Sequence, residues 1–182
     1  MDKDDKDGGN TTQLGQTIYG NATGDWFGDS LDISSDGKFL AIGSPGEISN
    51  FDRPGYVQVY TLEISDGLGY MWKQLGQNIY GEAVYDWFGN SVSLSEDGKT
   101  IAVGAYNNNG NGDDSGHVRV YRMDDSQSEW VNFGDDINGE AAYDGSGQPV
   151  SLSADGNTVA ISSPYNDDNG YDSGHVRVFD LE

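Results

Sequence analysis

The stretch DWFGNSVSLSEDGKTIAVGA, residues 86–105, decides the fold. Val92 and Leu94 alternate with serines, which predicts a strand with one buried face and one solvated face. The Asp97-Gly98 pair that follows supplies the positive φ of a tight hairpin turn. Residues 100–105 then run without alternation, the pattern of a strand that is buried on both faces. Two strands joined by a hairpin are therefore predicted here.

This pattern occurs three times along the chain. Corresponding glycines stand at positions 28, 89 and 147, so successive copies follow each other at a nearly constant spacing. Residues 72–79 read as a first strand that opens the second copy, and residues 116–121 read as its last strand. A regular period of this length indicates one supersecondary unit stacked on itself. Four antiparallel strands per unit predict an all-β fold of β-propeller blades, at about 13–62, 70–123 and 128–182.

Composition narrows the class of partner. The chain carries 31 acidic and 9 basic residues, a net charge of −22, and this field disfavours nucleic acid. No apolar run is long enough to span a bilayer, so membrane insertion is not expected. The absence of cysteine excludes disulfides and Cys-type zinc sites. Residues 1–12 are predicted to form an acidic, flexible segment ahead of the repeats.

The repeated motifs resemble the FG-GAP repeat of integrin α-subunit heads and of bacterial and algal surface proteins. The second copy carries the resemblance in Phe88-Gly89, Asp97-Gly98, Ile101–Ala105 and Gly116–Tyr121. The first copy has Phe27-Gly28 and Asp36-Gly37, whereas the third has Gly145-Ser146-Gly147 in place of Phe-Gly. The resemblance implies a non-enzymatic extracellular or cell-surface module for adhesion or assembly. The calcium loop that often follows Phe-Gly in integrin repeats is too short here to be carried over.

Three blades do not close a ring, because propellers have at least four. Either the chain is part of a longer propeller, or several copies assemble, or another protein completes the structure. Two copies would give six blades. We therefore expect self-association or a protein partner, and a structural subunit of an oligomer or filament is an alternative function.

Two Asn/Asp/Gly loops correspond to each other in the second and third copies. Their oxygen-bearing residues are candidate ligands for calcium as a possible cofactor, although the spacing is not that of an EF-hand. An ordinary loop is the alternative, since these residues also dominate turns. The related loop of the first copy, residues 47–54, has fewer such ligands. The candidate ligands are Asn109, Asn111, Asp113, Asp114, Asp167, Asp168, Asn169 and Asp172.

A tryptophan stands beside an acid in two copies, as Asp25-Trp26 and Asp86-Trp87. An exposed indole next to a hydrogen-bond acceptor suits stacking against a sugar, so a carbohydrate-binding propeller is a second alternative and a glycan a candidate partner. The same indoles would equally pack between blades. His117 and His175 occupy equivalent positions, for which we expect solvent-facing side chains. No recognisable nucleophile constellation supports an enzyme.

Overall fold

The structure is a computed structural model that describes residues 11–46, 54–67 and 69–182. These residues form strands, turns and loops without a helix, and so contain no helix that could cross a membrane. Most of the predicted N-terminal segment, residues 1–12, and nearly all of the first-copy loop at 47–54 lie outside the described residues. The strands form three antiparallel sheets, as expected for three blades, and the sheets do not close into a ring.

Sheet 1 has the strand order β1-β2-β3-β4, and β5 pairs with the other end of β3. Its long third strand therefore has two successive partners on its outer side, one at each end. The strands are β1 (Ser30–Ile33), β2 (Phe39–Ser44), β3 (Tyr56–Ser65), β4 (Gly69–Gln74) and β5 (Ile79–Tyr80). The segment expected to open the second copy, residues 72–79, thus lies on the outer edge of the sheet before it.

Sheet 2 repeats this arrangement. Its order is β10-β8-β7-β6, with β9 pairing with β8 beside β10. Its strands are β6 (Ser91–Leu94), β7 (Thr100–Ala105), β8 (His117–Asp124), β9 (Glu129–Asn132) and β10 (Ile137–Asn138). The turn between β6 and β7 contains Gly98 at φ +68°, which confirms the predicted hairpin.

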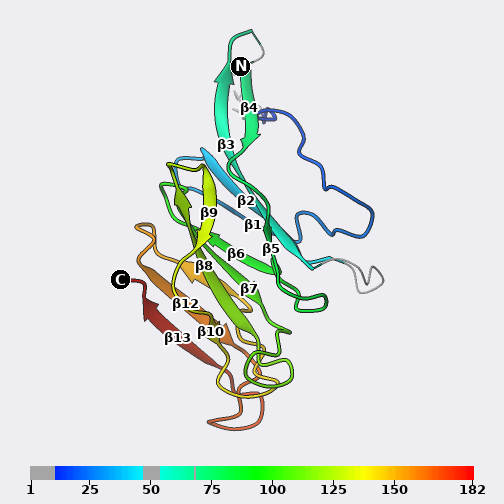
Figure 1. Ribbon diagram of the computed structural model, residues 1–182, viewed down its shortest axis with the longest axis vertical. Coiled ribbons are helices and arrows are strands. Elements are labelled where there is room, and N and C mark those ends of the chain that lie inside the picture. The colour runs from blue at the N-terminus through cyan, green and yellow to red at the C-terminus, as the bar shows by residue number, and fades with distance from the viewer. Residues whose placement is uncertain (1–10, 47–53, 68) are drawn as a thin grey trace, which may run out of the picture.

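Sheet 3 has three described strands, in the order β11-β12-β13. They are β11 (Val150–Leu152), β12 (Thr158–Ser163) and β13 (His175–Asp180). No described strand pairs with the outer side of β13, where sheets 1 and 2 each carry their two short outer strands. Figure 1 shows β13 at the border of the molecule, with sheet 2 lying between sheets 1 and 3.

The core lies between the sheets. Strand β7 is buried along its whole length, as predicted, because it is packed on both sides. Ile101 and Val103 join the cluster shared with sheet 1, and Ala102 joins the cluster shared with sheet 3. The expectation of a half-solvated β6 was wrong: Ser91 and Ser93 are buried. Their hydroxyls accept hydrogen bonds from main-chain N–H groups of β11 in sheet 3.

Candidate functional site

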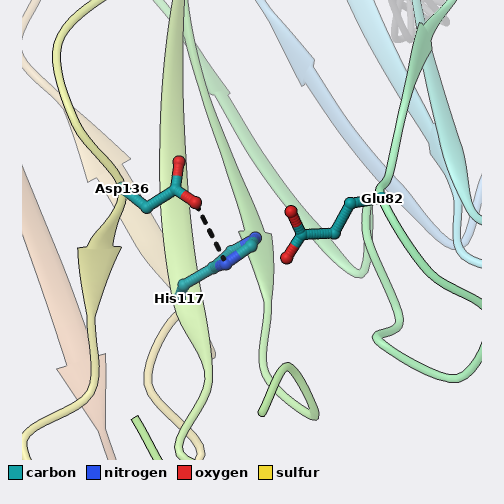
Figure 2. Close-up of side chains that lie close together, drawn as sticks. All are labelled: Glu82, His117 and Asp136. Atoms are coloured by element: carbon teal, nitrogen blue, oxygen red, sulfur yellow. Dashed lines mark ion pairs between the residues drawn. The ribbon is translucent and has the colours of Figure 1, made fainter. Parts of the chain in front are cut away.

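A histidine lies between two carboxylates where sheet 1 passes into sheet 2 (Figure 2). Glu82 follows β5, His117 opens β8, and Asp136 precedes β10, which pairs with β8. One ligand atom of each side chain lies within 4.8 Å of those of the other two, so the group could hold a metal ion. The separation between His117 Nδ1 and Asp136 Oδ2 is 3.9 Å. A histidine with carboxylates suits a transition metal better than calcium.

Arg119 already bridges both carboxylates of this group. Its Nε and Nη2 atoms each donate to Asp136 at 2.6 Å, and Nη2 also donates to Glu82. This pairing holds the pKa of Asp136 below its usual value and raises the pKa of Arg119. A bidentate guanidinium–carboxylate contact is among the stronger charge-assisted pairs. A metal ion would therefore have to displace Arg119, and the arrangement acts first as an ion network that joins β8 to the segments on either side.

His117 is only 1% exposed, so the expected solvent-facing position was wrong. Glu82 after β5 and Asp136 before β10 lie beside the His117 side chain, and local alternation cannot reveal such neighbours. Burial lowers the pKa of His117, and the neighbouring Arg119 lowers it further. Within the described residues, His117 Nδ1 has no hydrogen-bond partner. The sequence signal was the joint recurrence of Glu82, His117 and Arg119 one repeat later, as Glu140, His175 and Arg177.

Acidification is expected to destabilise the protein through His117. An unfolded histidine takes up a proton near pH 6.5, whereas buried His117 resists protonation until lower pH. The stabilising contribution is therefore complete above about pH 6.5 and is lost as pH falls towards the lowered pKa. The melting temperature should fall as the pH is lowered from about 7.5 to 5.5. Each kcal/mol of stability that is lost should lower it by about 2–4 °C.

The variant His117→Asn should flatten this pH profile, because the titrating group is gone and an amide of similar size remains. Calorimetry at several pH values checks the expectation. Keeping the pH above about 5.5 avoids protonating most carboxylates. A variant that loses stability with pH as steeply as the natural chain would show that His117 is not responsible.

The third copy holds a similar but more open group. Glu140, Asp168 and His175 could hold a metal ion, with His175 Nδ1 at 3.6 Å from Glu140 Oε2. Arg177 Nη1 lies 3.7 Å from Glu140, and Nη2 donates to the Asn138 carbonyl. The carboxylate that Asp136 supplies in sheet 2 comes from the segment that leads into the outer strand β10, and the described residues contain no such outer strand in sheet 3.

Most of the eight candidate calcium ligands make hydrogen bonds within their own loops or to a neighbouring segment. Asn109 Oδ1 accepts from the Asp114 N–H, and Asp167 Oδ1 accepts equivalently from the Asp172 N–H. Asn111 donates to the carbonyls of residues 139 and 140. Of the eight, Asp168 alone joins a potential metal-holding group within the described residues. Loop bonding of this kind is typical of Asx turns.

The acids beside the two tryptophans are buried. Asp86 accepts a hydrogen bond from Asn108 Nδ2 at 2.7 Å, and burial raises the pKa of Asp86. Asp25 accepts from the Ala22 N–H and from the Tyr56 hydroxyl. Both carboxylates therefore have partners inside the protein. The rings of Trp26 and Trp87 contact each other edge to face, with centroids 5.4 Å apart.

The third copy has no tryptophan at this position, and a hollow lies beside the glycine found there. Gly145 occupies the position of Trp26 and Trp87, and like them it has a positive φ. The hollow has a volume of about 200 Å³ and is lined by Tyr106, Tyr143, Tyr165, Asn107, Asp114 and Gly145. Trp87 packs against Tyr106, with centroids 5.6 Å apart, so an aromatic row extends from Trp26 to this hollow.

The two ends of the stack of sheets expose apolar side chains that are buried elsewhere in the repeat. On β13, Val176 and Val178 are each 65% exposed, whereas the equivalent Val118 and Val120 on β8 are 0% and 2% exposed. Sheet 3 covers the β8 valines, and no described residues cover those of β13 in the same way. Two such positions on one strand form an apolar stripe.

The opposite end shows the complementary pattern. Leu31 and Ile33 of β1 are exposed, whereas the equivalent Val92 and Leu94 of β6 are buried against sheet 1. The two end faces of the chain thus correspond to the two sides of an ordinary junction between neighbouring sheets.

The family model for the FG-GAP repeat matches residues 81–121. This range runs from the end of the sheet 1 outer strand through most of β8 and contains the motifs of the second copy. The second copy is therefore similar to an FG-GAP repeat over these residues, and the resemblance is confirmed there. No curated protein matches the chain.

Proposed function

We propose that this chain is a non-enzymatic interaction module of the cell surface or extracellular space, and that it assembles through its two open end faces. The observation that carries the proposal is the contrast between exposed Val176 and Val178 on β13 and their buried counterparts on β8. The FG-GAP repeat at residues 81–121 supports an interaction role and the extracellular setting, because the repeat is typical of surface proteins that bind partners.

Burial of the end faces provides the driving force. Each large apolar side chain that passes from water into a junction contributes about 1.5–3 kcal/mol. One junction between two copies would bury four such exposed side chains, which are Val176 and Val178 from one end face and Leu31 and Ile33 from the other. This gain is set against the cost of association, which is itself several kcal/mol, so assembly is expected to depend on concentration.

Charge opposes this association. The chain carries a net charge of −22, so two copies repel each other, and dissolved salt screens this repulsion. Assembly should therefore strengthen as salt is raised. In this proposal calcium assists assembly by binding at the acidic loops of the second and third copies, where its charge would reduce the repulsion between copies.

Glycan binding has weaker support than assembly. Asp25 and Asp86, the acceptors expected beside the indoles, are buried and bonded within the protein. The two end faces, in contrast, both expose apolar side chains.

Light scattering after size exclusion tests the proposal across a range of protein concentration and salt. We expect a mass that rises from 19.6 kDa towards at least twice that value as protein and salt increase. The double variant Val176→Lys/Val178→Lys should weaken association at least tenfold, about 1.4 kcal/mol, because it places two charges in the junction. The matched control is Ile64→Lys, at an exposed site on the β3–β4 hairpin.

The same samples are measured with millimolar calcium and then with a chelator. A larger mass with calcium would assign the loops a part in assembly. The mass of a single chain at every concentration and salt would contradict the proposal, as would a lysine pair on β13 that associates as well as the natural chain.

A further inference from the structure

We propose that residues 13–20 of one copy supply an outer strand to sheet 3 of a second copy, at the edge of β13 where the described residues place none. This inference rests on the proposed assembly and specifies its contact. It pairs a segment of known sequence with a strand edge of known register, and so it predicts which side chains meet.

The first support is the sequence of the segment. Residues 13–20 read QLGQTIYG, and residues 74–81 read QLGQNIYG, so they differ only where Thr17 replaces Asn78. In the structure, residues 74–81 run from the end of β4 through β5 and close the outer side of sheet 1. A segment of nearly the same sequence is suited to close the outer side of another sheet in the same way.

The second support is that the segment lacks this role within its own copy. Residues 13–20 belong to no described strand. Tyr19 is 77% exposed, and Ile18 is partly exposed, whereas Ile79 is 4% exposed in the closed sheet. Ile18 is the counterpart of Ile79, but it lacks the buried position that Ile79 has in sheet 1.

The third support is the open edge of β13. In sheet 1, Ile79 pairs with Val57, and in sheet 2, Ile137 pairs with Val118. These partners stand at the second residue of β3 and β8, and Val176 stands at the second residue of β13. The shared register therefore places Ile18 opposite Val176. Adding a strand to an unpaired edge satisfies main-chain groups and covers the apolar stripe beside them.

The fourth support is a set of hydrogen bonds that holds residues 74–81 in place and that recurs at residues 13–20. Gln77, in the connection between β4 and β5, donates to the Trp130 carbonyl and accepts from the Trp130 N–H, both at 2.8 Å. The indole N–H of Trp130 donates to the Leu75 carbonyl at 2.9 Å. These three hydrogen bonds fix the connection between β4 and β5 of sheet 1 to the outer strand β9 of sheet 2.

The segment 13–20 makes the same three hydrogen bonds one sheet earlier. Gln16 donates to the Trp72 carbonyl at 2.6 Å and accepts from the Trp72 N–H at 2.9 Å, and the Trp72 indole donates to the Leu14 carbonyl at 3.0 Å. Residues 13–20 therefore lie against sheet 1 where the outer strand of a preceding sheet would lie.

A second copy that places sheet 3 at this position would bring its β13 valines towards Leu31 and Ile33. A single arrangement of the two copies would thus produce both the strand addition and the contact between the end faces. One residue opposes a perfect continuation of the repeat. Ser162 stands where Gly43 and Gly104 stand in the internal junctions, and a Cβ at Gly104 would lie 2.2 Å from the Gly147 carbonyl oxygen. The junction between copies must be slightly wider, and Ser162→Gly should tighten association.

Cysteine cross-linking tests the register directly, because the natural chain has no cysteine. Full-length Ile18→Cys and full-length Val176→Cys are mixed and oxidised under conditions where the mass shows association. Residues paired across strands lie within the range of a disulfide. We expect a mixed dimer to form at least tenfold faster than with two controls, Ile18→Cys mixed with Val178→Cys and Ile18→Cys mixed with Ile64→Cys.

The outcomes separate this inference from the proposed function. Association without preferential linking of residues 18 and 176 would overturn the strand pairing and leave assembly standing. A monomer under all conditions would overturn both. Preferential linking, together with tighter association of the Ser162→Gly variant, would establish the pairing, whereas weaker association of that variant would contradict the stacked geometry.

Discussion

Replacing Phe88 by alanine is expected to lower the free energy of unfolding by about 3–5 kcal/mol. The side chain is 1% exposed and lies in the core cluster between sheets 1 and 2. Its ring meets Tyr121 edge to face, with centroids 6.3 Å apart. Truncation removes the ring from a site that sheets on both sides hold in place, so the cavity cannot collapse fully. Urea unfolding followed by circular dichroism measures the loss.

Phe27→Ala is the matched control, because Phe27 has the equivalent position in the first copy. It is only partly buried, and its ring stacks on Tyr56 with centroids 6.4 Å apart. We expect less than half the effect of Phe88→Ala. Equal losses for the two variants would mean that the junction between sheets contributes little to the burial energy of Phe88. Both variants should be compared at a protein concentration where the chain is monomeric, since assembly would add stability.

Replacing Gly104 by alanine is expected to cost about 3 kcal/mol, at the upper end of the range for overpacking. The added Cβ would lie 2.2 Å from the main-chain oxygen of Gly147 and 3.1 Å from its carbonyl carbon. A main-chain oxygen cannot rotate away as the end of a side chain can, so sheets 2 and 3 would have to separate. Thermal unfolding should show a lower midpoint, by about 2–4 °C for each kcal/mol.

Ser162→Ala is the control for this substitution. Ser162 has the corresponding position on β12, where a Cβ is already present, so its truncation should change stability by less than about 0.5 kcal/mol. If Gly104→Ala proved as mild as this control, the close approach of the two sheets would not be needed for stability.

The local pattern of the chain predicted much of the fold. The Asp97-Gly98 turn and the fully buried β7 followed from residues that are close in sequence. The nearly regular spacing of the repeats predicted three sheets of one kind, because similar sequence meets similar neighbours in each copy. The sequence predicted the candidate sites less completely than the fold. The tryptophans and loop acids were found as residue types, but their hydrogen-bond partners lie on other segments.

The remaining errors share one cause, which is contact between sheets. Ser93 and His117 were expected to face solvent, yet both are buried beside segments that are distant in the sequence. Residues 72–79 were expected to begin a unit, yet they pair with β3 of the sheet before. Periodicity reports which residues of a strand share a face, but the covering of that face is decided by segments far away in the sequence.

The sequence by itself thus determined the strands, their turns and their repetition, since these depend on backbone preference and on short-range alternation. Only the tertiary structure decided which edge each outer strand closes, and which of the equivalent valine pairs remains exposed. The physical reason is that burial is a property of the packed neighbour. Val118 and Val176 have the same local sequence, and the presence of a following sheet distinguishes the buried side chain from the exposed one.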